Sequence, residues 1–390
     1  MRPSPWHGRL VALSEQGLER RMRVMDSAPG PVVETPDGPK LCFCSNDYLG
    51  LAADPRLVEA VKRGADRWGA GAASSRLVAG NSAVHAELEG CLAAFAGTEA
   101  AVLFPSGYQA NLGALTALTA EGDSIFSDEL IHASLVDGCR LSRARVRIFR
   151  HRDTSHLEQL LREAGGPGLK LIVTDAVFSM DGDLAPLEEI CRLADRHDAR
   201  IFLDEAHALG VIGPGGRGLA AQLGLSDRVA VSSYTLGKAL GVSEACVACD
   251  TTAARLLVSR ARSLLYTTAA PAHLCEALLT ALSLTEAADA RRERLAANVA
   301  LFRELAGRAG IPLADSTTPI QPVPVGDSHR VMRVSAGLWD DGVFVQGIRP
   351  PTVPEGAARL RVTLTAAHEP GHVERLVDAL AHALFAPEGK

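Results

Sequence analysis

The sequence predicts an α/β protein, with a mainly parallel sheet of seven strands, flanking helices, and a smaller α+β domain at the C-terminal end. From about Ala100 to Asp250, short apolar runs alternate with helical patterns, as is typical of parallel strands joined by crossover helices. After about Pro271 this alternation gives way to a segment rich in Ala, Leu, Glu and Arg. A length of 390 residues, 47% of them hydrophobic, is sufficient for one large core and a smaller second one.

The elements of the sheet region follow in chain order. A helix is expected first, because Val84, Leu88 and Phe95 recur at helical spacing. A later crossover helix is expected over Pro186–Arg196, where the proline suits a first helical turn. The seven strands are expected where apolar runs lie between turn residues, at Ala101–Phe104, Ser124–Phe126, Val146–Phe149, Leu171–Thr174, Ile201–Leu203, Val229–Ser232 and Ala245–Ala248.

The C-terminal part is expected to hold a long helix over Ala277–Ala306, with room for an interruption, then short strands and a final helix near His372–Leu384. We therefore expect an N-terminal segment over residues 1–45, a large domain over 46–275 and a small domain over 276–390.

Charge and hydropathy exclude several classes of protein. The net charge is −6, and no run of Lys and Arg with interleaved aromatics is present, so a nucleic-acid partner is not expected. The N-terminus has no apolar signal region, and no stretch reaches the roughly 18 apolar residues of a membrane span. We expect a cytoplasmic protein without membrane association.

The eight cysteines lie mostly among apolar residues. Cys246 and Cys249 have CxxC spacing, but no second pair and no histidine cluster completes a metal site. We expect buried reduced thiols and no bound metal.

Ligands collect at the carboxyl ends of parallel strands, so the residues after each predicted strand are the candidates for a site. After the first strand, a turn with Ser106 and Gly107 runs into a helix, whose N-terminus can hold a phosphate. Ser-Gly before a helix is also a common N-cap without any ligand. The turn alone therefore does not favour a phosphate site over a simple helix cap.

Two further strand ends carry ionisable groups. Asp204 ends a buried apolar strand, where it needs a partner: either a protonated ring nitrogen of pyridoxal phosphate (PLP) or a structural arginine or helix terminus. Lys238 lies among small residues, between Gly237 and Gly241, where its amine can form an imine with an aldehyde. A loop lysine is normally solvated, but the residues around Lys238 are almost uncharged.

Together these strand ends resemble the fold-type I PLP enzymes, and more narrowly the α-oxoamine synthases, which condense an amino acid with an acyl thioester and release carbon dioxide. The resemblance extends from about Leu41 to the C-terminus. The phrases that carry it are Asn46-Asp47-Tyr48-Leu49-Gly50, Asp128-Glu129-Leu130-Ile131-His132-Ala133-Ser134, Val177-Phe178-Ser179-Met180-Asp181-Gly182-Asp183 and Asp204-Glu205-Ala206-His207.

The resemblance implies a role for each matching residue. Lys238 would form the imine with PLP, Asp204 would pair with the ring nitrogen, and His132 would stack on the ring. Arg361 would hold the carboxylate of the amino acid, for which a planar guanidinium is suited. Contacts to the ring hydroxyl would come from Ser179 and His207, and contacts to the phosphate from Gly107, Tyr108, Thr235 and, across a homodimer interface, Thr267 or Thr268.

Within that family, the segments Ile320–Gly326 and Ile348–His368 resemble the branch that joins L-alanine to a pimeloyl thioester, giving 8-amino-7-oxononanoate. In that branch the threonine that matches Thr352 and an N-terminal arginine, here Arg20 or Arg21, contact substrate. The sequence leaves open whether the acyl group arrives on coenzyme A or on acyl-carrier protein.

Two other functions are the alternatives for this sequence. A sister enzyme that uses glycine and a short acyl-CoA, such as a glycine C-acetyltransferase or a 5-aminolevulinate synthase, stays open, because one methylene changes binding by only about 1–3 kcal/mol. The sequence also departs from the family at Ala239-Leu240 and at Glu244, where a small residue is usual. A catalytically silent protein that binds a partner is disfavoured, because Lys238, Asp204 and Arg361 are all present.

Overall fold

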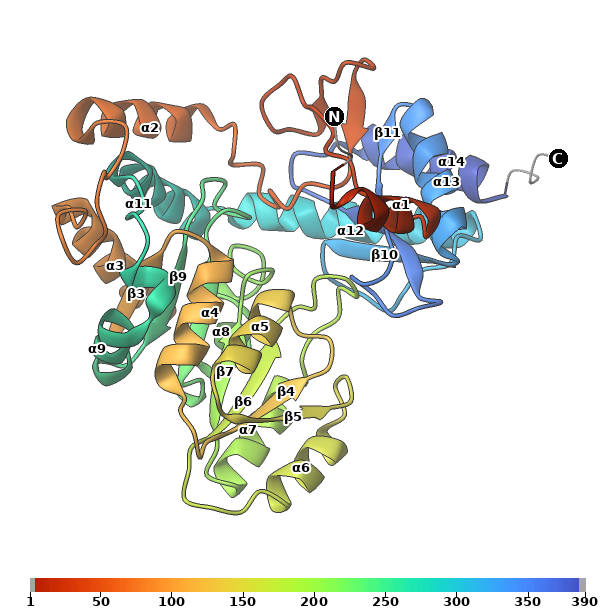
Figure 1. Cartoon of the computed structure of the whole chain (residues 1–390). Helices are drawn as coiled ribbons and strands as arrows, with labels where there is room; N and C mark the ends of the chain where they lie inside the picture. The colour runs from red at the N-terminus through yellow and green to blue at the C-terminus, as the bar shows by residue number, and fades with distance from the viewer. Residues whose placement is uncertain (1–3, 386–390) are drawn as a thin grey trace. The chain divides into compact units, whose positions relative to one another are not determined.

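The computed structural model describes residues 4–385, which form two compact units (Figure 1). Within the described residues, unit 1 comprises residues 4–46, 180–182 and 294–385, and unit 2 comprises residues 47–179 and 183–293. The outermost residues of the predicted N-terminal segment and small domain, 1–3 and 386–390, lie outside the described part. The units are clusters of contacts, so the division into domains after residues 45 and 275 stays a prediction.

Unit 2 contains the predicted seven-stranded sheet, which confirms the α/β fold. The strand order is β3-β9-β8-β7-β6-β4-β5, and β9 runs antiparallel to both of its neighbours, whereas the other pairs are parallel. The strands are β3 (Ala100–Phe104), β4 (Ser124–Asp128), β5 (Arg145–Phe149), β6 (Lys170–Asp175), β7 (Arg200–Asp204), β8 (Val231–Thr235) and β9 (Ala245–Cys249).

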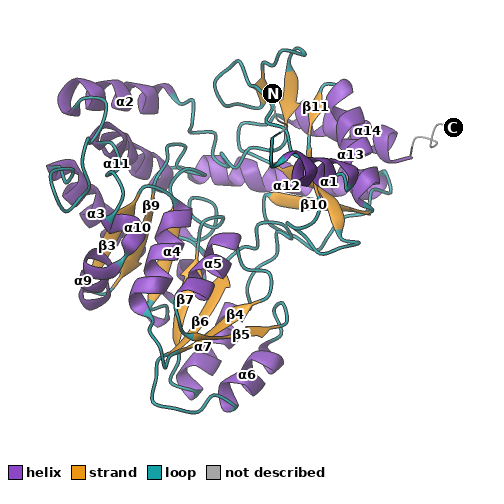
Figure 2. Cartoon of the chain, in the orientation of Figure 1, coloured by secondary structure: helices purple, strands orange, loops and turns teal. Residues whose placement is uncertain are grey.

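Helices cover both faces of this sheet, as the purple helices around the orange strands in Figure 2 show. On one face, Ala114 and Leu115 of α4 and Leu135 of α5 pack against Val173 and Phe202 in a continuous apolar cluster. The helices of unit 2 are α2 (Pro55–Trp68), α3 (Ala83–Ala96), α4 (Gly107–Leu118), α5 (Ala133–Leu141), α6 (Thr154–Arg162), α7 (Leu187–Arg196), α8 (Leu219–Gln222), α9 (Thr251–Arg260), α10 (Arg262–Leu265) and α11 (Ala272–Glu286).

Unit 1 contains two three-stranded sheets, in the orders β1-β2-β11 and β10-β13-β12. The pairs within them are antiparallel except for β2 and β11. The strands are β1 (Val32–Val33), β2 (Lys40–Cys42), β10 (Ile320–Gly326), β11 (Val343–Phe344), β12 (Gln346–Ile348) and β13 (Ala358–Thr363). Its helices are α1 (His7–Glu15), α13 (Ser328–Asp340) and α14 (Pro370–Phe385), while α12 (Asp289–Arg308) begins in unit 2 and continues in unit 1.

Most strands of the large sheet extend one or two residues beyond their predicted bounds, and three elements differ in other ways. Strand β8 begins at Val231 rather than Val229, because a short turn over Ser226–Arg228 precedes it and pairing with β7 starts at Val231. Helix α7 begins one residue late, with Pro186 as its N-cap. The long predicted helix is two helices, divided after Glu286. Across residues 4–385, every helix is too short or too polar to cross a lipid bilayer.

Candidate active site

A cavity of about 140 Å³ lies in unit 2, at the carboxyl ends of the parallel strands. Eight of the residues that the sequence singled out line it: Gly107, Tyr108, His132, Ser179, Asp204, His207, Thr235 and Lys238. Asn111, Ser134, Asp175, Val177 and Ala206 complete the lining. Two larger cavities of unit 2, about 490 Å³ each, are lined by none of the predicted site residues.

The N-terminus of α4 forms one end of the cavity. The hydroxyl of Ser106 caps the helix by accepting from the N–H of Gln109 (3.3 Å). A side chain at position 107 would not fit, because a Cβ there would lie 2.4 Å from Oγ1 of Thr235. The N–H groups of a first helical turn have no acceptor within the helix, so this glycine-lined turn can bind a phosphate. The hydroxyl of Tyr108 donates to Asp137, outside this turn.

Asp204 lies at the end of β7 and is 5% exposed. One carboxylate oxygen accepts from the N–H of Ala206 (2.9 Å), and the other accepts from the side-chain amide of Asn111 (2.7 Å). These two donors fix the orientation of a carboxylate whose burial would otherwise be costly.

A chain of hydrogen bonds connects Asp204 to His132. The amide of Asn111 also donates to the hydroxyl of Ser134 (2.9 Å), which lies 2.7 Å from Nδ1 of His132. The N–H of Ser134 donates to the same nitrogen (3.2 Å), so Nδ1 is an acceptor and the proton of a neutral ring is on Nε2. Burial lowers the pKa of His132, and of the two nearby charges Asp204 raises it and Lys238 lowers it. His132 is thus a neutral, oriented ring at neutral pH.

Lys238 lies in the loop after β8, with its Nζ 3.0 Å from Nε2 of His207. An ammonium at Lys238 donates to this nitrogen, which leaves the ring proton of His207 on Nδ1. Nδ1 lies 2.6 Å from the hydroxyl of Tyr48, which is fully buried. Tyr48 therefore helps to orient the ring of His207, a role that its position in the Asn46–Gly50 phrase did not reveal.

Asp175 lines the cavity but was not predicted. It ends β6, pairs in register with Asp204 on the neighbouring strand, and is 3% exposed. Burial raises the pKa of Asp175 well above its usual value, and the negative charge of Asp204 raises it further. Burial and the neighbouring carboxylate both disfavour the charged form of Asp175.

The position of Glu244 favours a small residue, because its backbone is left-handed and its side chain is buried. Its backbone has a φ of 62°, a conformation that favours glycine, and its carbonyl accepts from Leu236 in the Lys238 loop (3.0 Å). Its side chain is buried, and this burial raises the pKa of Glu244 to about 7.

Some predicted residues lie outside the cavity lining. Thr267 and Thr268 follow α10, where Oγ1 of Thr267 accepts from the amide of Gln109 (3.5 Å). Of the predicted substrate contacts, His132 lines the cavity, whereas Arg20, Arg21, Thr352 and Arg361 belong to unit 1.

In unit 1 the guanidinium of Arg361, on β13, donates to Oδ1 of Asn46 (3.1 Å) and to Oγ1 of Thr363 (3.0 Å). Arg20 donates to the hydroxyl of Thr352 (3.2 Å), and both Arg20 and Arg21 are exposed. The structure therefore pairs two of the predicted substrate contacts, across more than three hundred residues of chain.

The cavity in unit 2 has the chemical groups that PLP requires. The glycine turn of α4 suits the phosphate, Asp204 suits a protonated ring nitrogen, and Lys238 supplies an amine for the aldehyde. The close approach of Gly107 to Thr235 is the clearest sign of fit, because any larger residue would fill the space at the helix N-terminus.

The chain matches the family model of the aminotransferases of class I and II over residues 39–380. It is 49% identical to the 8-amino-7-oxononanoate synthase of Aromatoleum aromaticum over 371 residues, which cover 95% of this chain and 96% of that protein.

Solved structures are similar over most of the chain. A structure of SPT with PLP as an internal aldimine has a TM-score of 0.92 and 28% identity, and the match covers 97% of each chain. The 8-amino-7-oxononanoate synthase of Francisella tularensis has a TM-score of 0.75 and 29% identity, covering 88% of this chain and 97% of that one.

Proposed function

Since the chain belongs to the family of the 8-amino-7-oxononanoate synthases, within the aminotransferases of class I and II, we propose that it condenses L-alanine with a pimeloyl thioester. The products are 8-amino-7-oxononanoate, carbon dioxide and the free thiol, and the reaction serves biotin synthesis. The observation that carries the proposal is the cavity that gathers the amine of Lys238, the carboxylate of Asp204 and the ring of His132.

PLP is the cofactor, and when bound it supplies an aldehyde that condenses with amines and a pyridinium ring that withdraws electrons from the Cα atom of an amino acid. The first turn of α4, with Gly107 and Tyr108, and the hydroxyl of Thr235 hold its phosphate. His132 covers one face of the ring, and Ser179 and His207 contact the ring hydroxyl. Thr267 or Thr268 reaches the cofactor of a neighbouring subunit.

Asp204 and Lys238 have the two chemical roles. Asp204 pairs with the ring nitrogen, and Asn111 and the N–H of Ala206 fix its carboxylate by donating to its two oxygens. Lys238, as a free amine, accepts the Cα proton of alanine, and His207 receives a hydrogen bond from it when it is charged.

The substrate contacts come from unit 1. Arg361 binds the carboxylate of alanine through its planar guanidinium. Arg20 and Thr352, which already hydrogen-bond to each other, contact the acyl substrate. A reaction of glycine with a short acyl-CoA is the alternative.

Incubating the purified protein and PLP with each amino acid and each acyl donor tests the proposal. The amino acids are L-alanine, glycine and L-serine, and the donors are pimeloyl-CoA, pimeloyl-acyl-carrier protein, acetyl-CoA and palmitoyl-CoA. Mass spectrometry should find 8-amino-7-oxononanoate from L-alanine with a pimeloyl donor as the main product. A preference for glycine with acetyl-CoA would contradict the proposal and favour the alternative.

We expect a homodimer. Leu77, Val78 and Tyr266 are exposed apolar side chains of unit 2, and Tyr266 adjoins the threonines proposed to reach a neighbouring subunit. Sedimentation at low micromolar concentration should give about twice the 41.1 kDa mass of one chain. A monomer at that concentration with full activity would refute the dimer.

We propose that the protein works in the cytoplasm. Its eight cysteines are free thiols, which suits a reducing compartment.

A further inference from the structure

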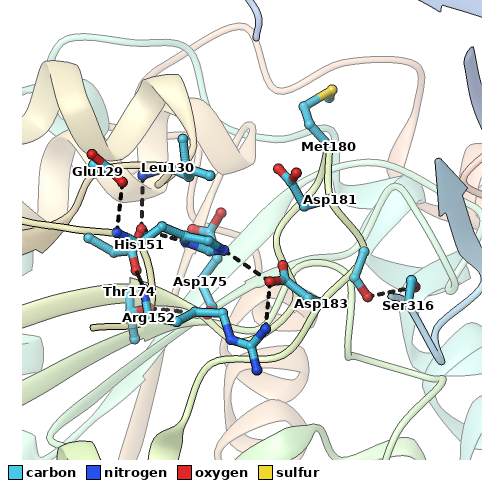
Figure 3. A network of polar contacts seen from close by, with 12 residues as sticks. Glu129, Leu130, His151, Arg152, Thr174, Asp175, Met180, Asp181, Asp183 and Ser316 are labelled. Atoms are coloured by element: carbon cyan, nitrogen blue, oxygen red, sulfur yellow. Dashed lines mark hydrogen bonds and ion pairs between the residues drawn. The ribbon is translucent and has the colours of Figure 1, made fainter. Parts of the chain in front are cut away.

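His151 lies outside the cavity, immediately after β5, and two carboxylates hold its ring. Nδ1 lies 2.9 Å from Oδ1 of Asp128, and Nε2 lies 2.9 Å from Oδ2 of Asp183 (Figure 3). The N–H of His151 also donates to the carboxylate of Glu129 (2.8 Å). Both ring nitrogens and the backbone of one histidine are therefore engaged by acids from two other segments.

One of these segments carries Ser179. Val177 and Leu184 form an antiparallel bridge, and the N–H of Phe178 donates to the carbonyl of Asp183 (3.0 Å), so residues 177–184 form a hairpin. His151 contacts both arms of this hairpin. On one arm, His151 forms an ion pair with Asp183. On the other arm, its ring packs edge-on against the ring of Phe178, with 4.4 Å between the ring centroids.

The other segment leads to His132. Oδ1 of Asp128, which faces His151, also accepts from the N–H of Leu130 (2.9 Å), two residues before His132. Oδ2 of the same carboxylate accepts from the N–H of Arg152 (2.8 Å). Asp128 thus fixes the turn between β4 and the ring that is proposed to cover PLP.

The ring of His151 must carry two protons to bond to both acids, because a neutral imidazole has only one N–H. Burial acts to lower the pKa of His151, but the hydrogen bonds and charges of Asp128 and Asp183 outweigh it and raise this pKa to about 9. The charged groups around the ring are Asp128, Asp183, Glu129 on the backbone side, and Arg152, which pairs with Asp183 at 3.0 Å.

We propose that His151 is a positioning residue, whose doubly protonated ring joins the Asp128 turn to the 177–184 hairpin and so holds His132 and Ser179 at the cofactor cavity. The importance of these two cavity residues rests on the proposed function, but the joining of the two segments does not. His151 itself touches neither the substrate nor the cofactor. Arg152, the next residue along the chain, also contacts both segments, since its N–H donates to Asp128 and its guanidinium pairs with Asp183.

His151→Asn tests this, with Asp183→Asn as a second variant that keeps the imidazole and removes one of its acids. His382→Asn is the matched control, because His382 also pairs with an aspartate, Asp341, but on the surface of unit 1. The readouts on the PLP-loaded full chain are amide hydrogen exchange by mass spectrometry, the visible spectrum of the bound cofactor, and kcat and KM for alanine.

Both His151→Asn and Asp183→Asn should speed amide hydrogen exchange at least about tenfold in residues 176–185. His151→Asn should also speed it in residues 129–133. Exchange in the rest of the chain should stay as in the wild type. The cofactor spectrum should shift, and kcat should fall about 10- to 100-fold with little change in KM, because small displacements of reacting groups have effects of this size. His382→Asn should behave as wild type.

The wild-type protein supplies an independent test through pH. Because the pKa of His151 is raised to about 9, its hydrogen bonds to Asp128 and Asp183 both persist below this pH. Above it the ring loses one proton, and one of the two hydrogen bonds is lost. After correction for intrinsic exchange, protection of residues 176–185 should fall as pH rises through about 9, and this fall should be absent in Asp183→Asn.

Wild-type exchange in both segments of His151→Asn, or wild-type protection of the hairpin above pH 10, would overturn the positioning role. Faster exchange throughout the chain would also overturn it, because His151 would then be a general stabilising residue. Unchanged product formation in a variant with locally faster exchange would contradict only the expected effect on catalysis. Absence of any product in the wild type would contradict the proposed function but would not affect the exchange result.

Discussion

Replacement of Lys238 by alanine should reduce the formation of 8-amino-7-oxononanoate by roughly 10⁴-fold, which is the upper range for a positioned acid–base group. Alanine removes both the amine that attaches PLP and the base proposed to take the Cα proton. The cavity should persist, because Asp204, His132 and the α4 turn are held by contacts that do not involve Lys238. Product formation under saturating substrates measures the effect.

Borohydride identifies the attachment site directly. The wild-type protein with PLP should be yellow, and borohydride should fix the cofactor on Lys238, where peptide mass spectrometry should locate it. Lys62→Ala is a matched control, since Lys62 is an exposed lysine paired with Glu59, and this variant should be labelled and active as wild type. A reduced adduct on another lysine, or none at all, would remove the central assignment.

Replacement of Asp204 by asparagine should leave PLP bound but slow exchange of the alanine Cα proton with solvent by about 10²- to 10³-fold, or roughly 3–4 kcal/mol. The amide is similar in shape but carries no negative charge, so the ring nitrogen no longer stays protonated. The hydrogen bond from Ala206 can persist to the remaining oxygen, which keeps the loop in place. Proton exchange followed by NMR, without an acyl donor, isolates this step.

Arg361→Ala provides the contrast. It should chiefly raise KM for alanine, because it removes a contact to a carboxylate that is present before and during the reaction. If Asp204→Asn exchanged the Cα proton at the wild-type rate, the electron-withdrawing role of the paired ring would have to be abandoned.

The strands of unit 2 could be predicted because each is a short apolar run with its turn residues adjacent in sequence. Gly107, Asp204 and Lys238, which end or follow these strands, line one cavity. The predicted bounds of β8 began two residues too early, because the inner residues of the strand, such as Ser232 and Ser233, are small and polar although they are buried. Hydrophobicity alone favoured the Val229-Ala230-Val231 run over the residues that pair with β7.

The missed site residues act over long sequence separations. Asn111 contacts Asp204 from within a helix, 93 residues away, and Tyr48 contacts His207 across 159 residues. Their neighbours in sequence are typical of helices and loops, so no local pattern marks them. Asp175 could have been found, because it is an acid at the end of a buried apolar strand, as Asp204 is.

Both units are discontinuous in sequence, since the chain leaves unit 1 after residue 46, returns for residues 180–182 and returns again at residue 294. No single truncation of the gene therefore yields either unit. Recombination with a relative has the same constraint: a crossover inside either unit separates residues that pack together. Exchange of the three residues Met180–Gly182 would be the smallest graft that moves a piece of unit 1, and a transplanted unit 1 would need all three of its segments.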